Sequence, residues 1–295
     1  MTKPVEHTPI QAHMPETYRT IEKMGLAAKL AHLEAFGFTV IEPEHVAEPQ
    51  FFRRLRDRIL AIAEARSGVK PDLETGATHA DREGPTGQHL FYLLFDDPIF
   101  EQALMNPVVL AFMTYLLGPD CLLSSASSII KGPGKVPLML HSDSANIPTP
   151  LPHQMMVANA TYLLTDYTKE NGALFFVPCS HRLAREPNMA ERANEELRYT
   201  IEAPAGSLVI WGGTMWHGAH ARTAPGLRIN LILYFCRMFM RTQELYHGNV
   251  PAEVLARNNE RFARLMGEHV WYGWKSEGPN AVKQRAASWL DYGRS

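Results

Sequence analysis

The stretch Val136-Pro-Leu-Met-Leu-His-Ser-Asp143 decides the fold, because a short extended run ends there in His141 and Asp143. Alternate residues of a strand point the same way, so an imidazole and a carboxylate share one face. One further ligand would complete the two-histidine, one-carboxylate triad typical of non-haem Fe(II) oxygenases, which leaves the opposite face of the metal open. An H-x-D triplet alone is weak evidence in a chain with 13 histidines. It needs a partner elsewhere in the chain.

That partner is His217, in the stretch Trp211-Gly-Gly-Thr-Met-Trp-His-Gly-Ala-His220. Arg228 follows 11 positions later, at the start of an apolar run that ends at Phe235. Between the triplet and His217 lies Glu170-Asn-Gly-Ala-Leu-Phe-Phe-Val-Pro-Cys-Ser-His181. In this order the motifs resemble those of the phytanoyl-CoA dioxygenase-like family of Fe(II)/2-oxoglutarate oxygenases.

The resemblance runs from about residue 36 to residue 235 and implies a role for each motif. It implies that His141, Asp143 and His217 bind Fe(II) and that Arg228 pairs with the far carboxylate of 2-oxoglutarate, with O2 as the second cosubstrate. The third stretch is similar to the family's N-G-x-L-x-x-x-P-G-S-H, with Cys179 where glycine is usual. The resemblance therefore implies a dioxygenase that releases succinate and CO2.

A further cosubstrate contact is implied on the strand that leads into Leu164-Thr-Asp166. Alignment of this segment with the family assigns the contact to Tyr162, where the family usually has tryptophan, and puts Asn159 on the other face of the strand. Halogenating relatives replace the carboxylate with glycine or alanine, so Asp143 favours hydroxylation of a C–H bond. Desaturation and ring closure stay open.

Two other classes of function stay open beside the oxygenase. One is a jelly-roll metalloprotein that uses the same three ligands for Zn(II) or another ion in non-oxidative chemistry. The other is a non-catalytic relative that only binds a ligand, although the complete triad and Arg228 count against it. Conversion of 2-oxoglutarate to succinate in the presence of Fe(II) separates the oxygenase from both.

Composition excludes some partners and leaves the substrate open. The 29 Lys and Arg residues nearly balance 31 Asp and Glu, so no net field attracts nucleic acid or an anionic membrane. Three separated cysteines argue against a disulfide framework, and no run of 18 apolar residues occurs, which favours a cytoplasmic protein. The expected partner is a small or medium-sized organic molecule with apolar surface, and the oligomeric state stays undetermined. We expect four apolar residues near its entrance: Met156, Trp216, Phe235 and Met238.

Periodicity predicts a mainly β protein with flanking helices (α+β). Helical spacing covers residues 27–35, 51–66, 107–117, 251–266 and 281–290, whereas 1–24 and 69–90 read as irregular. Short extended runs separated by turns indicate an antiparallel sandwich or jelly roll, the double-stranded β-helix of the resembled family. The expected strands are 36–41, 121–131, 136–141, 155–164, 173–177, 199–203, 208–211 and 228–235.

We expect one domain over residues 1–295, because no sharp break in composition occurs. Within it, residues 1–119 form an N-terminal arm with supporting helices, residues 120–238 the jelly-roll core, and residues 239–295 a helical C-terminal segment. Three large aromatic residues in Trp271-Tyr-Gly-Trp274 either close over the active-site mouth or anchor the tail. Gln88, at the end of the irregular stretch 69–90, is a further candidate for a cosubstrate contact.

Overall fold

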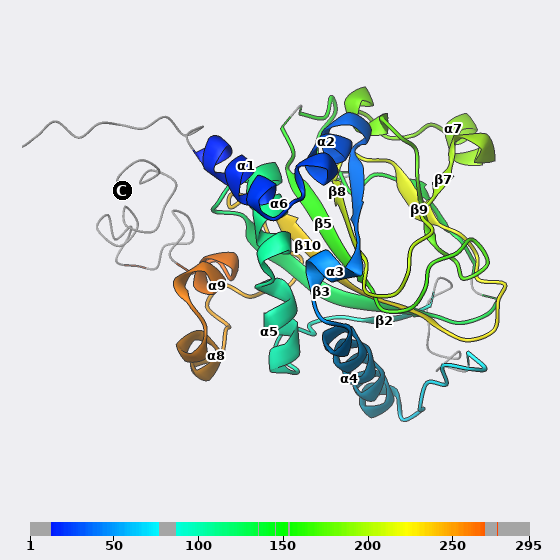
Figure 1. The fold of residues 1–295 in the computed structure, drawn as a ribbon, viewed down its shortest axis with the longest axis horizontal. Coiled ribbons are helices and arrows are strands. Elements are labelled where there is room, and N and C mark those ends of the chain that lie inside the picture. The colour runs from blue at the N-terminus through cyan, green and yellow to red at the C-terminus, as the bar shows by residue number, and fades with distance from the viewer. Residues whose placement is uncertain are drawn as a thin grey trace, which may run out of the picture.

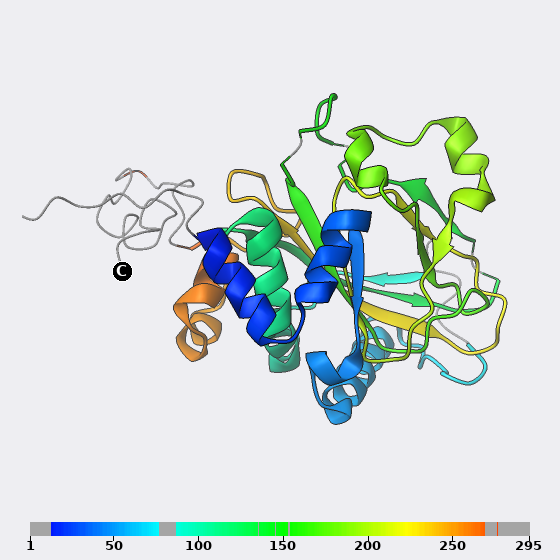
Figure 2. The same ribbon diagram turned by 45° about the horizontal axis from the view of Figure 1, so that its top comes forward.

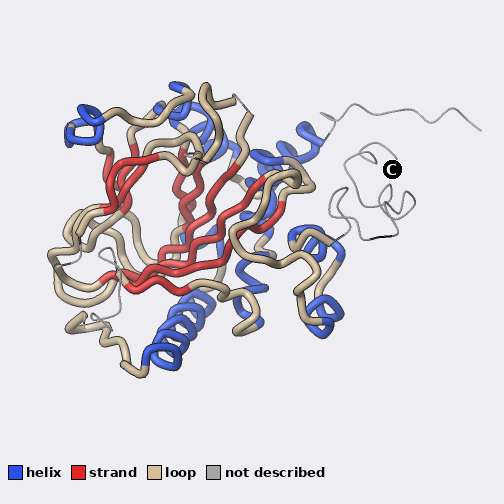
Figure 3. Tube along the Cα trace, turned by 180° about the vertical axis from the view of Figure 1, so that it is seen from behind, coloured by secondary structure: helices blue, strands red, loops and turns tan. Residues whose placement is uncertain are grey.

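Two antiparallel β-sheets face each other in the computed structural model, which describes residues 13–76, 87–134, 136–144, 146–152, 154–268 and 276. The larger sheet has the strand order β1-β8-β5-β10-β3-β2 and the smaller one the order β4-β9-β6-β7 (Figure 1). Figure 3 shows the two sets of strands as separate layers. The larger sheet contains β1 (Phe38–Ile41), β2 (Gln88–Leu90), β3 (Leu122–Lys131), β5 (Val157–Leu163), β8 (Leu208–Gly212) and β10 (Arg228–Cys236). The smaller contains β4 (Leu138–His141), β6 (Leu174–Phe176), β7 (Tyr199–Thr200) and β9 (His217–Ala219).

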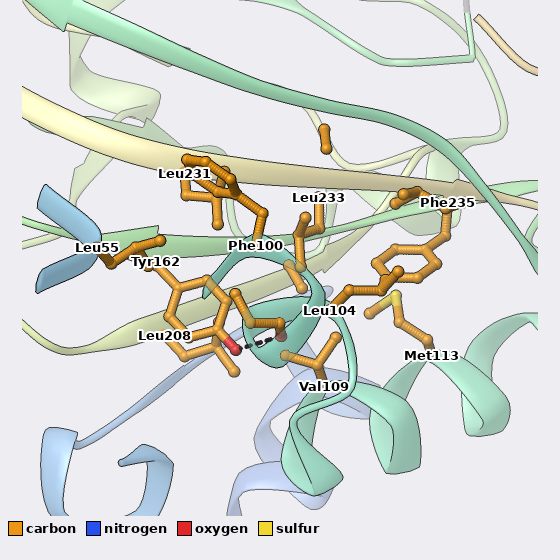
Figure 4. Packing of buried hydrophobic residues seen from close by; sticks show 14 of the residues in the cluster. Leu55, Phe100, Leu104, Val109, Met113, Tyr162, Leu208, Leu231, Leu233 and Phe235 are labelled. Carbon is orange, nitrogen blue, oxygen red and sulfur yellow. Dashed lines mark hydrogen bonds between the residues drawn. The ribbon is translucent and has the colours of Figure 1, made fainter. Parts of the chain in front are cut away.

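Helices cover the outer face of the larger sheet, because that face is apolar. Ala158, Ala160 and Tyr162 of β5 point outward into a buried cluster that the helices share. Figure 4 shows part of this packing, in which Phe100 and Met113 contribute from the helical side. The helices on this side are α1 (His13–Lys23), α2 (Ala27–Phe36), α3 (Pro43–Val46), α4 (Pro49–Ser67), α5 (Pro98–Leu104), α6 (Pro107–Leu117), α8 (Ala252–Arg257) and α9 (Glu260–Leu265). The remaining helix, α7 (Met189–Ala193), contacts β4 of the smaller sheet instead. Figure 2 shows the same ribbon from a second direction.

The inner face of the larger sheet is polar along several strands. Asn159 and Thr161 of β5 point inward, as do Arg228 and Asn230 of β10, and all four line one cavity. In a sheet packed on both faces, inward polar side chains are costly unless they meet a partner. The fold therefore places its polar groups between the sheets, where a site is built.

Most sequence-based predictions of elements agree with the structure. The strands β3, β4, β5, β6, β8 and β10 and the helices α2, α4 and α6 lie within two or three residues of their expected ranges. Asn106 caps α6, since its side chain accepts from the Val108 N–H, and Pro107 occupies the first turn. The jelly-roll core and its α+β class are confirmed.

Three element predictions are wrong. The arm 1–24 contains α1, because Pro15 falls in the first helical turn, where proline is tolerated, and Ile21 adds an apolar contact to the core. Gln88 belongs to β2, which pairs with β3 at the edge of the sheet. The helix expected over 251–266 is divided into α8 and α9, because the Asn259 side chain accepts from the Phe262 N–H and begins a new helix.

The C-terminal part that the structure describes is anchored to α5. Buried Glu101 accepts hydrogen bonds from the Arg257 guanidinium and from Asn258 Nδ2, the latter at 2.6 Å. The aromatic stretch Trp271–Trp274 and the helix expected over 281–290 lie outside the described residues. Among the helices described, none is by itself long and apolar enough to cross a bilayer, and the bent pair α5 and α6 passes that test only jointly, by length and composition.

Candidate metal and cosubstrate site

Two strands of the smaller sheet bring the predicted histidines together. His141 at the end of β4 is the direct antiparallel partner of His217 at the start of β9, and their ring centroids lie 4.4 Å apart. Asp143 follows two residues after the end of β4. One ligand atom from each of the three residues lies within 4.8 Å of the others. The structure thus brings the three predicted ligands to one point.

Hydrogen bonds leave the same ring nitrogen of both histidines available. Nδ1 of His141 lies 2.7 Å from the Met139 carbonyl oxygen, and Nδ1 of His217 lies 3.1 Å from that of Met215. A carbonyl oxygen only accepts, so each Nδ1 carries the proton and each Nε2 keeps its lone pair. The two Nε2 atoms lie 3.7 Å and 3.6 Å from the oxygens of Asp143, too far to be hydrogen-bonded to them. This is the donor set that a divalent metal requires.

Burial favours the neutral, metal-binding form of His217. The side chain is buried, and desolvation lowers its pKa, opposed by the nearby carboxylate of Asp143. His141 is more open, with its side chain 31% exposed. The site therefore has a closed side at His217 and an accessible side at His141.

Two residues of the larger sheet hold the Asp143 carboxylate in place. Oδ2 of Asp143 accepts from Asn159 Nδ2 at 2.7 Å and from Trp211 Nε1 at 3.2 Å. Asn159 and Trp211 are themselves direct partners across β5 and β8, and both are buried. The hydroxyl of Tyr234, on the neighbouring strand β10, donates to the backbone oxygen of Asp143 at 3.2 Å. The orientation of Asp143 is thus fixed from the opposite sheet.

We expect Asn159→Leu to weaken metal binding roughly tenfold or more, the effect typical of losing a partner that orients a ligand. Leucine is similar in size but leaves Oδ2 of Asp143 with only the longer bond from Trp211. Equilibrium titration of the purified variant with Co(II) measures the effect without turnover. Exposed Asn249, remote from the cavity, is the matched control as Asn249→Leu. Equal affinity for the metal in the two variants would contradict an orienting role of Asn159.

The stretch 170–181 supports the strand that carries His217. The Ser180 hydroxyl accepts from the Trp216 N–H at 2.9 Å, and the Val177 N–H donates to the Trp216 carbonyl oxygen at 3.0 Å. Cys179 has φ of 67°, in the left-handed region where glycine is favoured. This explains in physical terms why the resembled motif has glycine at this position.

Arg228 lies in the same cavity as the three ligands. The cavity has a volume of about 170 Å³ between the two sheets, and its polar lining includes His141, Asp143, His217 and Arg228. Arg228 is 2% exposed; its Nη1 donates to the Gly172 carbonyl oxygen at 2.7 Å, and its guanidinium carbon lies 5.4 Å from the centre of the Tyr167 ring. Its Nε has no hydrogen-bond partner among the described residues.

Tyr162 lies outside this cavity, so the predicted contact between this residue and the cosubstrate is wrong. The side chain points outward from β5 into the helix-covered core, where its hydroxyl donates to the Ala103 carbonyl oxygen at 2.7 Å (Figure 4). Burial raises its pKa. The cavity side of β5 carries Asn159 and Thr161 instead.

We expect Tyr162→Phe to leave the affinity for 2-oxoglutarate unchanged and to lower the free energy of unfolding by about 1 kcal/mol, the net contribution of one buried hydrogen bond. Calorimetric titration and denaturant unfolding on the same preparation measure both quantities. A large loss of affinity with unchanged stability would restore Tyr162 as a contact.

Of the apolar residues expected at the entrance, two lie elsewhere. Trp216 is buried under the smaller sheet, where its Nε1 donates to the Arg185 carbonyl oxygen, and Phe235 packs in the helix-covered core (Figure 4). Met156 and Met238 are partly buried beside Tyr234. The apolar residues that do line the cavity include Ile129 and Ile232.

The other histidines are not part of the metal site. His181, His220 and His247 lie outside the group of three ligands, and His153 and His269 lie outside the described residues.

Comparison with known proteins agrees with this geometry. Residues 33–230 match the profile of the family described as Phytanoyl-CoA dioxygenase (PhyH). The chain is 26% identical over 280 residues to Dioxygenase af480 of Aspergillus fumigatus, a match that covers 93% of this chain and 88% of that protein. It is 25% identical over 247 residues to the uncharacterized protein Rv1501 of Mycobacterium tuberculosis, covering 81% and 85% of the two chains.

Solved structures of low sequence identity share the fold. The crystal structure of EctD from S. alaskensis with 2-oxoglutarate and 5-hydroxyectoine has a TM-score of 0.58 at 17% identity, over 73% of this chain and 77% of that one. HygX from Streptomyces hygroscopicus, with nickel and 2-oxoglutarate bound, has a TM-score of 0.58 at 16% identity, over 73% and 88% of the two chains.

Proposed function

Since this chain belongs to the phytanoyl-CoA dioxygenase family and is an Fe(II)- and 2-oxoglutarate-dependent dioxygenase, we propose that it hydroxylates a C–H bond of a small or medium-sized organic molecule. The overall reaction converts substrate, 2-oxoglutarate and O2 into hydroxylated substrate, succinate and CO2. One observation carries the proposal: the three ligands and Arg228 line a single cavity between the sheets.

His141, Asp143 and His217 are the proposed iron ligands. Two neutral imidazoles and one carboxylate suit Fe(II), and they leave further coordination positions for cosubstrate and oxygen. When bound, the iron supplies the oxidising chemistry that the side chains lack. The protein's part is to hold Asp143 through Asn159 and Trp211 and to orient both histidine rings through the contacts of their Nδ1 atoms with the Met139 and Met215 carbonyl oxygens.

Arg228 is the proposed partner of the 5-carboxylate of 2-oxoglutarate. A guanidinium is always charged and presents parallel N–H donors that fit a carboxylate. The Nε of Arg228, which has no hydrogen-bond partner among the described residues, supports this role, because a buried donor without a partner is costly until a ligand accepts from it.

The lining of the cavity supports a substrate with apolar surface. Ile129 and Ile232 line the cavity from neighbouring strands of the larger sheet. Asp143 occupies the position that a halide would need, which supports hydroxylation. The family name alone does not favour a CoA thioester as the substrate.

Succinate release tests the proposal directly. Purified protein with Fe(II), 2-oxoglutarate and O2 is expected to form succinate, slowly alone and faster with its substrate, so a panel of metabolites is screened for stimulation. Absence of Fe(II)-dependent succinate across the panel would favour the two other classes, a zinc protein or a ligand-binding relative.

A further inference from the structure

Ser142 lies between the proposed ligands His141 and Asp143, and its side chain is held by one carboxylate. Alternate residues of an extended chain face opposite sides, and Ser142 is buried without lining the cavity. Its hydroxyl donates to Glu186 Oε1, and its N–H donates to Glu186 Oε2 at 3.2 Å. Both oxygens of Glu186 thus contact the residue that joins two ligands.

Arg192, in α7, connects this carboxylate to the residue before His141. Its Nη1 donates to the Leu140 carbonyl oxygen at 2.7 Å, and its Nη2 lies 3.7 Å from Glu186 Oε2, within ion-pair distance. Its Nε donates to the Pro187 carbonyl oxygen at 3.1 Å, which fixes the guanidinium. An ion pair from one segment therefore contacts the backbone on each side of His141.

The place of β4 in the sheet explains why this contact matters. Among the described strands only β9 pairs with β4, and the register between the two is irregular from Leu138 to His141. The strand ends at His141, so Asp143 lies beyond the paired residues. The backbone of an edge strand has N–H and C=O groups that no neighbouring strand fixes. Glu186 and Arg192 supply an acceptor and a donor to this backbone, as a neighbouring strand would.

The same segment contacts the strand that carries the third ligand, His217. The Arg185 carbonyl oxygen accepts from Trp216 Nε1 at 2.7 Å, and the Arg185 guanidinium carbon lies 4.9 Å from the centre of the Trp216 ring. Trp216 immediately precedes His217 and is buried. Residues 185–192, which lead into α7 (Figure 1), therefore contact the chain next to all three proposed ligands.

We propose that Glu186 is a positioning residue of the metal centre, which sets the spacing of His141 and Asp143 by holding Ser142. This inference rests on the proposed assignment of the three metal ligands. Glu186 lies outside the group of residues whose atoms could hold one ion, so it acts through Ser142 and not by coordination. A metal requires its ligands at narrowly defined distances, and the residues around the ligands keep them there. Arg192 in turn holds the Glu186 carboxylate in place.

Glu186→Gln tests this role, because glutamine keeps the length of the side chain but has no charge and only one acceptor oxygen. We expect Co(II) to bind about tenfold more weakly, as is typical when a residue that orients a ligand loses its contact. We also expect the visible d–d absorption of the Co(II)-saturated variant to differ from that of wild type, because this absorption depends on the geometry of the ligands. Equilibrium titration followed by visible absorption measures both quantities.

Glu191→Gln is the matched control. Glu191 lies in the same segment and accepts two hydrogen bonds of 2.7 Å from Arg185 and one of 2.8 Å from the Asn188 N–H, neither of which is next to a proposed ligand. We expect its affinity for Co(II) and its spectrum to equal those of wild type. The melting temperature of each metal-free variant is measured in parallel. A role of Glu186 in stability alone would lower this temperature and leave the Co(II)-saturated spectrum unchanged.

Ser142→Ala removes the other partner of the same contact and decides the question if Glu186→Gln fails to fold. Alanine keeps the N–H that donates to Glu186 and loses only the hydroxyl. We expect a change in the spectrum and a smaller loss of affinity than in Glu186→Gln. In the double variant the two losses are expected to sum to less than their separate values, because both substitutions break one contact.

The outcomes separate this inference from the proposed ligands. If wild type binds Co(II) and the folded variants at Glu186 and Ser142 keep its spectrum, Glu186 does not position the ligands, and the ligand assignment stands. An equal change of spectrum in Glu191→Gln would also overturn the role of Glu186. If wild type does not bind Co(II) at all, the ligand assignment fails and the inference with it.

Discussion

Asp143→Gly is expected to reduce hydroxylated product below detection. The substitution removes the one carboxylate among the three proposed metal ligands, while His141 and His217 keep their hydrogen bonds to backbone carbonyls. It also leaves Asn159 and Trp211 without the acceptor that they share. We expect affinity for Fe(II) to fall by more than the roughly 10- to 100-fold that follows loss of a residue which only orients a ligand.

The measurement has two parts, metal retention after gel filtration and product formed after reconstitution with excess Fe(II). Asp143→Asn is the matched variant, because asparagine keeps the size of the side chain and removes only its charge. We expect it to retain more metal than the glycine variant and to form little product. Halogenated product need not appear in Asp143→Gly, since the cavity must also admit chloride. A reconstituted glycine variant with wild-type product yield would show that Asp143 is not a ligand.

The triad was predictable because its members follow local rules. His141 and Asp143 are alternate residues of one extended segment, and His217 is recognisable from its motif and from the distance to Arg228. The structure places His141 and Asp143 beside each other, as alternation along a strand implies, and brings His217 to them, as the family resemblance implies. The strands of the core were predictable for the same reason, since their apolar faces and intervening turns are local features.

The residues that support the triad were not predictable, because they depend on pairing between distant strands. Trp211 reaches Asp143 only because β8 pairs with β5 in the register that sets Trp211 opposite Asn159. Lys131 faces Arg228 because β3 and β10 pair, although 97 positions separate the two residues in the sequence. The sequence around each residue does not indicate which distant residue it will pair with.

The error at Tyr162 follows from the period of two along a strand. A shift of one or three residues moves a side chain to the opposite face of the strand. An alignment error of that size therefore assigns a core residue to the cavity. Asn159, three positions earlier, faces the cavity, whereas Tyr162 faces α5. The signal for Asn159 was a polar side chain that alternates with Thr161 in a strand whose other residues are mostly apolar. A buried position tolerates such a side chain only with a partner.

Arg228→Ala is expected to weaken binding of 2-oxoglutarate by on the order of 10²-fold or more, with little change in affinity for Fe(II) measured without cosubstrate. Charge-assisted hydrogen bonds contribute about 1.5–3 kcal/mol net each, and each 1.4 kcal/mol is about one decade in affinity. Arg228 Nη1 is already bonded to the Gly172 carbonyl oxygen, which holds the guanidinium in place. Its other donors are then oriented before the cosubstrate arrives, so little of the binding energy is lost in ordering the side chain.

Arg228→Lys is expected to recover only part of this loss, because an ammonium keeps the charge without the planar pair of donors. The matched control is Arg222→Lys, since Arg222 is also a buried arginine near Arg228 but does not line the cavity. Anaerobic calorimetric titration of metal-loaded wild type and the three variants compares the affinities. Identical affinities in wild type and Arg228→Ala would instead remove Arg228 from the cosubstrate site.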